Sequence, residues 1–193
     1  MFLTEDELLK KRFSELSDRA LSRNIYVFSD FLSLYEQSLV NDAVKYGVGF
    51  FGGSENAEKN ISGFGNENDI GYEPEIPVKC IRISPLSQKF SDDLTHRDFL
   101  GSLMNLGIKR ETLGDIIISE NSGYLFCLER VACYICDNLI KVRHTSVRAE
   151  LCPAMPKGAE AEPTPKIITV SSERADVLIS AVYNISRSKS AAL

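Results

Sequence analysis

The sequence has no apolar run that approaches the roughly 18 residues needed for a membrane-spanning helix. Its first residues also differ from a secretory signal, because acidic residues 5–7 and basic residues 10–12 occupy the place of an apolar core. These two absences argue against a membrane protein and against an exported one. We therefore expect a cytoplasmic chain that has no membrane partner.

Histidine is scarce, and cysteine lacks a metal-binding pattern. The chain has 2 histidines, His96 and His144, and 5 cysteines. An odd number of cysteines in a cytoplasmic chain argues against a disulfide framework. Cys133 and Cys136 form one Cys-x-x-Cys pair, but a zinc site would need a second pair or histidines at matching spacing. We predict no metal site, and we interpret this pair as small apolar side chains on a helix.

A phosphate-binding loop is also missing. Gly52–Lys59 is a glycine turn that runs into a possible helical turn, but the Gly-Lys-Ser/Thr of a phosphate loop is absent. We therefore predict no cofactor and no small-molecule substrate. The net charge of −5 gives no support for nucleic-acid binding, although it does not exclude it, because a local basic patch sets the field at a contact.

What is present is an ordinary globular composition. With 44% hydrophobic and 25% charged residues, 193 residues can bury a core in one or two small domains and part of another. We predict an α+β protein with an N-terminal α/β domain (1–75), a middle domain (76–152), a linker (153–165) and a C-terminal unit (166–193). The linker is indicated by its proline, glycine and glutamate content.

In the N-terminal domain, helical spacing predicts a helix from Thr4 to about Arg23. A second helix is expected to open at Ser29 and Asp30 and to run to Val44 before Gly47. Residues 48–51 read as a strand, and residues 60–75, rich in Gly, Asn and Glu, as an exposed loop.

The middle domain is organised around a short helix with signals at both ends. Thr95 and Asp98 form a capping box before residues 96–106, and Gly107 supplies a left-handed end. Gly101 is expected to mark a close approach of this helix to a sheet. Lys109 and Arg110 follow the helix and form, with Arg97, a predicted basic corner that contacts phosphate.

Strands are predicted over 78–84, 114–119, 123–128 and 146–152, with a second helix over 129–141. The order is βαββαβ, the ferredoxin-like plan, with the first strand at the centre of the sheet. Tyr124 and Phe126 share one strand face, and two interpretations stay open for them: core packing or stacking against RNA bases.

After the linker, residues 167–170 read as a strand, and Ser172 caps a helix that Asn184 ends. Ser186 caps a further helix whose first turn contains Arg187 and Lys189. Cations are disfavoured at a helix start, so an anion such as a phosphate is one interpretation, and two solvated cations are the other.

Three motifs resemble the YlmH family of bacterial RNA-binding proteins: residues 96–103, residues 106–110 and residues 113–116. Residues 31–37, Gly52-Gly53 and residues 57–59 resemble its N-terminal domain. The end of the chain resembles a domain named for ribosomal protein S-four, through Arg174, Asp176, Leu178 and residues 186–189. Lys59, Ala175 and Ser190 depart from the family pattern, and the chain stops before the β-turn and strands that normally finish such a domain.

The resemblance implies a non-enzymatic protein that binds ribosomal or transfer RNA at the ribosome, in the rescue of stalled nascent chains or in cell division. A pseudouridine synthase is the alternative, but its Asp-containing loop has only one near match, Arg174–Asp176. His96 with Asp98 or Asp115 could form an acid–base pair, although capping and packing explain these residues better. We predict no catalytic residue. The predicted RNA-binding residues are Arg97, Lys109, Arg110, Arg174, Arg187, Ser188 and Lys189.

Overall fold

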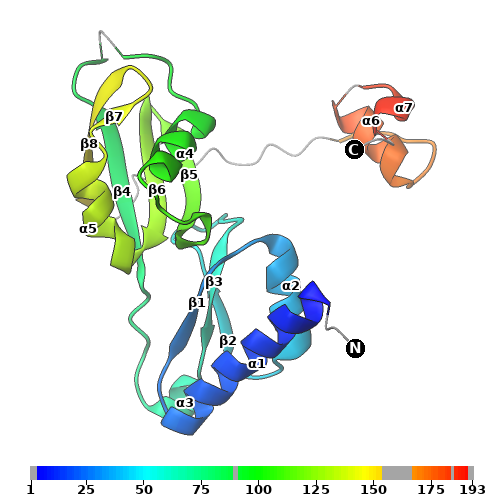
Figure 1. Cartoon of the computed structure of the whole chain (residues 1–193). Coiled ribbons are helices and arrows are strands. Elements are labelled where there is room, and N and C mark those ends of the chain that lie inside the picture. The colour runs from blue at the N-terminus through cyan, green and yellow to red at the C-terminus, as the bar shows by residue number, and fades with distance from the viewer. Residues whose placement is uncertain (1–3, 89–90, 154–166, 184, 191–193) are drawn as a thin grey trace. The chain divides into compact units, whose positions relative to one another are not determined.

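The computed structural model describes residues 4–88, 91–153, 167–183 and 185–190 (Figure 1). The chain forms two compact units, Met1–Glu160 and Ala161–Leu193. The first unit contains a three-stranded and a five-stranded sheet, and the second contains two short helices. The predicted mixture of helices and strands is confirmed.

The N-terminal part of the first unit is a three-stranded antiparallel sheet in the order β1-β3-β2, with two helices packed on it (Figure 1). Its elements are α1 (Glu5–Arg23), β1 (Val27–Leu32), α2 (Leu34–Ala43), β2 (Val48–Phe51), β3 (Asn60–Phe64) and α3 (Glu67–Ile70). The predicted first helix and the strand over 48–51 are confirmed. The core between helices and sheet consists of Phe13, Ala20, Val27, Leu32, Leu39, Val40 and Phe64.

The predicted helix over residues 29–44 is wrong in its first part, because β1 occupies Val27–Leu32. The capping box that starts α2 is formed by Ser33 and Glu36 instead. Ser29 resembles a helix cap, but its hydroxyl accepts a hydrogen bond from the Ser62 N–H at 2.8 Å, across the β1–β3 pair. The helix then ends at Ala43, four residues before the left-handed Gly47.

The predicted exposed loop over residues 60–75 is also wrong at its start. β3 is the central strand of the sheet, and its Ile61 and Phe64 are fully buried. A Cβ on Gly63 would lie 2.9 Å from the Phe28 ring, so this glycine lets the aromatic side chain pack on the strand. The possible helical turn in residues 52–59 is not formed.

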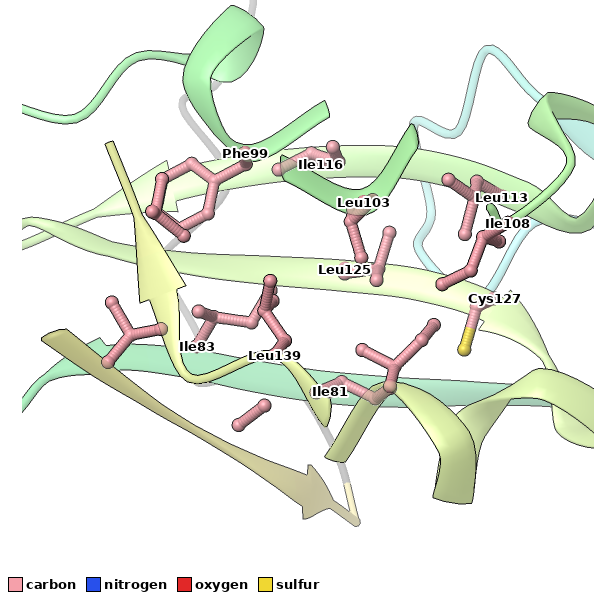
Figure 2. Packing of buried hydrophobic residues seen from close by; sticks show 14 of the residues in the cluster. Ile81, Ile83, Phe99, Leu103, Ile108, Leu113, Ile116, Leu125, Cys127 and Leu139 are labelled. Carbon is pink, nitrogen blue, oxygen red and sulfur yellow. The ribbon is translucent and has the colours of Figure 1, made fainter. Parts of the chain in front are cut away.

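The five-stranded antiparallel sheet has the order β5-β6-β4-β8-β7, with β4 at its centre as predicted. Its elements are β4 (Val78–Pro85), α4 (His96–Asn105), η2 (Arg110–Thr112), β5 (Leu113–Ser119), β6 (Ser122–Leu128), α5 (Glu129–Asn138), β7 (Lys141–Val142) and β8 (Thr145–Cys152). The βαββαβ order of the main elements agrees with the prediction, and β7 is an additional edge strand. The predicted helix over 129–141 is too long, because α5 ends at Asn138 and Lys141 belongs to β7. Both helices pack on one face of the sheet: Figure 2 shows Phe99 and Leu103 of α4 over Ile83 and Leu125.

Part of the opposite face of this sheet is covered by the N-terminal sheet. We call this part the closed face, and it consists of Cys80, Tyr124, Phe126 and Leu128, which are buried together with Phe31 and Ile61. Arg82 and Arg148, on the same side of the sheet, stay exposed. Tyr124 is 6% exposed and Phe126 is 2% exposed. Of the two open interpretations, the structure selects core packing, because a base cannot stack on aromatic rings that are already covered.

The second unit contains α6 (Ala175–Tyr183) and α7 (Arg187–Ser190). The predicted strand over Ile167–Val170 is wrong, because these residues have no regular secondary structure and Ile167 is 96% exposed. A lone strand without a pairing partner is not stable in water. The predicted helix stop at Asn184 and most of the linker lie outside the described residues.

Candidate functional site

Helix α4 begins at the predicted capping box and carries the exposed Arg97 in its first turn. Asp98 Oδ2 accepts hydrogen bonds from the Thr95 N–H at 2.9 Å and from the Thr95 hydroxyl at 2.6 Å. These bonds lower the pKa of Asp98, because they stabilise its charged form. Arg143, in the β7–β8 turn, places its Nε 3.6 Å from Asp98 Oδ1. Asp98 therefore caps the helix and lies close to Arg143, which is distant from it in the sequence.

A cleft of about 520 Å³ opens between α4 and the segment that joins α5 to β7. We call it the α4 cleft. Three exposed cations line it, namely Arg97, Lys141 and Arg143. Asp98 is the one carboxylate among the described residues that line it. The α4 cleft therefore has an excess of positive charge in a chain whose net charge is negative.

Gly101 lines this cleft and does not mark a close approach to the sheet. That prediction is wrong, because a Cβ built on Gly101 meets no atom of the described chain within 4 Å. The close approach lies on the sheet side instead: a Cβ on Gly123 would lie 2.9 Å from the Phe99 ring. The strand glycine makes room for the helix, and the helix glycine faces open space.

Lys109 and Arg110 follow the C-terminal end of α4, after Gly107 with its φ of 77°. Lys109 is exposed, whereas Arg110 is half-buried and its NH1 donates a hydrogen bond to the Leu113 carbonyl at 2.9 Å. Burial lowers the pKa of Arg110 and that of Lys59, and the charge of Arg110 lowers the pKa of Lys59 further. Arg110 is therefore engaged within the fold, and Lys109 faces solvent.

Asp115 connects the two sheets of the first unit. Its Oδ2 accepts hydrogen bonds from the backbone N–H groups of Glu58 at 2.7 Å and Lys59 at 3.2 Å. Asp98 and Asp115 thus hold backbone N–H groups at different places, which agrees with capping and packing as their roles. In the described part of the chain, no group of three or more His, Cys, Asp or Glu side chains is placed to hold a metal ion. No helix there is long and apolar enough to cross a membrane.

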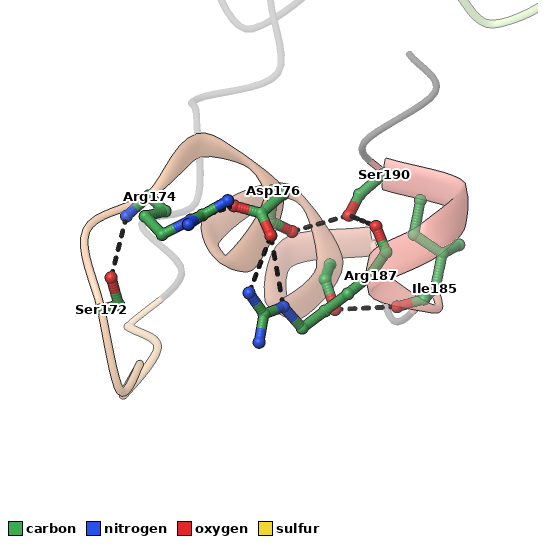
Figure 3. Close-up of polar contacts among 7 residues, drawn as sticks. Ser172, Arg174, Asp176, Ile185, Arg187 and Ser190 are labelled. Carbon is green, nitrogen blue, oxygen red and sulfur yellow. Dashed lines mark hydrogen bonds and ion pairs between the residues drawn. The ribbon is translucent and has the colours of Figure 1, made fainter.

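In the second unit, two predicted RNA-binding arginines meet at one carboxylate. Arg174 Nε lies 3.0 Å from Asp176 Oδ1, and Arg187 NH2 lies 2.9 Å from Asp176 Oδ2; both arginines point toward Asp176 in Figure 3. These hydrogen bonds lower the pKa of Asp176. The Ser190 hydroxyl donates to the Asp176 carbonyl at 2.7 Å, which ties α7 to α6. Asp176 therefore organises this basic group.

The remaining predicted residues of this unit, Ser188 and Lys189, are exposed on α7. Ser186 acts as the predicted cap, since its hydroxyl accepts the Lys189 N–H at 3.3 Å. The predicted residues of the first unit do not form one corner, because Arg97 lies in the first turn of the ten-residue α4 and Lys109 and Arg110 follow its other end. Sequence reasoning missed Lys141 and Arg143, which line the α4 cleft although they are far from α4 in the sequence.

The chain is similar to known proteins in sequence and in fold. Residues 75–155 match the family model described as "Putative RNA-binding domain in YlmH". Over 169 residues the chain is 28% identical to the "Ribosome-associated protein quality control protein P2" of Bacillus subtilis (strain 168), with 86% of this chain and 65% of that protein covered. The chain thus spans about two thirds of that relative's length.

A solved structure titled "Cell division protein ylmH from Streptococcus pneumoniae" has a similar fold, with a TM-score of 0.61 at 23% identity. The similarity covers 79% of this chain and 94% of that chain. The family match lies on the five-stranded sheet and its two helices, where the motifs around α4 were found. The resemblance to the YlmH family seen in the sequence is therefore confirmed, and residues 75–155 match the domain described for YlmH.

Proposed function

We propose that this chain binds RNA at the ribosome without catalysing a reaction, and that it serves translation quality control in the cytoplasm. The observation that carries the proposal is the family match over residues 75–155, a region whose α4 carries exposed cations near both ends. The printed name of the Bacillus subtilis relative supports the ribosome as the place of action. Its RNA is ribosomal or transfer RNA.

Two basic surfaces support this proposal. The first consists of Arg97 and Lys109 near the ends of α4, together with the α4 cleft. The second consists of Arg174, Arg187 and Lys189, with Ser188 beside them. In the second surface, one carboxylate faces two arginines, so that Asp176 positions the guanidinium groups and leaves an excess of positive charge. Phosphate oxygens accept hydrogen bonds from such planar groups.

The proposal is tested by sedimentation of the purified chain with bacterial ribosomes through a sucrose cushion over a range of salt concentrations. We expect the chain to pellet with ribosomes at low salt and to be released as salt rises, because phosphate contacts release counterions. The salt slope gives the number of phosphate contacts. A chain that stays in the supernatant at every salt concentration would contradict the proposal.

The contribution of the second surface is tested with Arg187→Ala/Lys189→Ala. We expect the double substitution to weaken ribosome binding and to lower its salt slope, because it removes two exposed cations. Equal binding by the parent and the variant would assign the contact to the first unit.

A further inference from the structure

The α4 cleft has the dimensions and lining of a ligand site. Its volume of about 520 Å³ lies within the range of roughly 300–1,000 Å³ that is usual for pockets that bind small groups. Beside the three cations, Asn105 and Asn138 bring side-chain amides to it, and Leu106 and the 72%-exposed Ile140 bring apolar surface. The lining therefore combines charge, hydrogen-bonding groups and an apolar wall in one place.

Gly101 is unexplained by the fold itself. A glycine inside a helix destabilises it by roughly 0.5–1 kcal/mol relative to alanine. The usual compensation is a close neighbour that needs the space, but a Cβ here would meet no atom of the described chain within 4 Å. The space over Gly101 is part of the α4 cleft. A group that enters the cleft and lies against the helix would explain why this position is a glycine.

Arg143 is the second residue that the fold does not favour. It adopts a φ of 52°, in the left-handed region, within the turn between β7 and β8. Glycine suits this position of a two-residue hairpin, and a long side chain there costs stability. Unfavourable backbone conformations of this kind gather at binding sites. Here the residue points to the cleft, where it faces Asp98.

The charge of the cleft selects an anion. Asp98 already accepts two hydrogen bonds from Thr95 at its Oδ2, so this oxygen is engaged in capping the helix. Arg97, Lys141 and Arg143 are exposed and lie on different elements around the opening. A phosphate group fits such a set of cations, and the side-chain amides and apolar wall suit the planar base attached to it.

The closed face strengthens this assignment. In a sheet with two helices on one face, RNA bases often stack on aromatic rings of the other face. In this chain, Tyr124 and Phe126 of that face are covered by the N-terminal sheet. RNA bases therefore cannot stack on these two rings, whereas the α4 cleft on the helix side is open to solvent.

We propose that the α4 cleft binds one unpaired nucleotide of the RNA, with its phosphate at Arg97, Lys141 and Arg143 and its base in the space over Gly101. This inference rests on the proposed function, because it assigns the RNA contact to a particular place. The base lies against the apolar wall of Leu106 and Ile140, and Asn105 and Asn138 are placed to hydrogen-bond its edge. The cleft thus reads a single base that is not paired with another.

The first test fills the cleft without removing charge. In Gly101→Leu, the new side chain occupies the base position, and leucine favours the helix more than glycine does. We expect a melting temperature equal to or above that of the parent, and an affinity for ribosomes lowered about tenfold, as for the loss of one base contact. Gly101→Ala, with its smaller side chain, is expected to keep most of the affinity and to raise stability.

The second test removes charge. Arg97→Gln/Lys141→Gln is compared with Arg19→Gln/Arg148→Gln, which loses the same charge at exposed positions on α1 and β8 outside the cleft. We expect the cleft variant to lower the salt slope of binding by about 0.7, as for one lost phosphate contact, and the control to leave it near that of the parent. Arg143→Gly is expected to keep the melting temperature, since glycine suits the turn, and to weaken binding.

Each measurement uses purified ribosomes and a fluorescent single-stranded oligonucleotide of mixed sequence. If the parent binds neither probe, the proposed function itself is overturned. If the parent binds and Gly101→Leu binds equally well, RNA binding stands and the cleft is not its site. Loss of ribosome binding with unchanged oligonucleotide binding would also overturn this inference, because the cleft would then contact a ribosomal protein.

Discussion

The two sides of the five-stranded sheet differ in the solvent accessibility of the side chains that suit RNA binding. On the closed face, Tyr124 and Phe126 are the residue types that stack with bases, but the N-terminal sheet covers them. On the helix side, Arg97 and Arg143 remain exposed around the α4 cleft. A suitable residue type is therefore not sufficient for RNA contact, because packing by segments that are distant in the sequence determines which side chains stay accessible.

The largest effect is expected from a substitution that opens the closed face. Phe126→Ala should lower the free energy of unfolding by about 3–5 kcal/mol, because it removes a buried aromatic ring and leaves a cavity. Denaturant unfolding measures this loss. Ile118→Ala, on the adjacent strand and 38% exposed, is the control and should cost far less. Equal losses in both variants would contradict a packed closed face.

A smaller loss is expected where Asp115 connects the two sheets. Asp115→Ala leaves the N–H groups of Glu58 and Lys59 without their carboxylate acceptor, which should cost about 1.5–3 kcal/mol. Asp137→Ala, at an exposed position of α5, is the matched control. Denaturant titration of both variants compares them, and a loss at Asp137 as large as that at Asp115 would remove the reason to regard Asp115 as a connection.

Substitutions of the neighbouring residues Lys109 and Arg110 are expected to separate an effect on stability from an effect on RNA binding. Arg110→Gln should lower the free energy of unfolding by about 1 kcal/mol, since it removes the hydrogen bond to the Leu113 carbonyl. Lys109→Gln, at an exposed site, should change stability by less than about 0.5 kcal/mol and should weaken ribosome binding. Thermal unfolding and sedimentation test the pair together. The reverse pattern would show that Arg110 is the RNA contact.

The smallest effect is a dependence of stability on pH at the start of α4. The folded chain holds the pKa of Asp98 below its ordinary value, so this carboxylate stabilises the fold at pH values above its unfolded pKa. That contribution is lost as pH falls through the lower, folded pKa. The difference in melting temperature between the parent and Asp98→Asn should therefore be largest near pH 7 and should shrink toward pH 3. Asp18→Asn, on α1, is the control, and a constant difference for Asp98→Asn would contradict this account.

The strands and helices of the middle region could be predicted because their signals are local. Thr95, Asp98 and Gly107 define α4 from within a few residues, and a β-branched run defines β5. In the N-terminal region the deciding contacts are not local. Ser29 looks like a helix cap in the sequence, yet its hydroxyl serves a strand pair with Ser62, 33 positions away. β3 reads as a loop because its Gly63 is needed by the Phe28 ring rather than by a turn.

The residues of the candidate site could likewise be predicted only where their signals are local. The sequence indicates Arg97, Lys109 and Arg110 because they stand near recognisable helix ends, but it does not show that Arg110 turns back onto the Leu113 carbonyl. It also does not show that the turn after β7 returns Arg143 to the start of α4. In the sequence, Gly101 indicates helix–sheet packing, and only the three-dimensional arrangement shows that its open side faces a cleft. Clefts depend on segments that are distant in sequence, so their lining is not a local property.

The closed face also has a practical consequence for work with parts of this chain. A fragment cut to residues 75–155 would follow the family boundary but would leave behind Phe31 and Ile61, which cover Tyr124, Phe126 and Leu128. Such a fragment would expose a contiguous apolar surface to water, and surfaces of that kind drive self-association. Its recovery from cells as aggregates would then reflect the missing cover rather than a failure of the domain to fold.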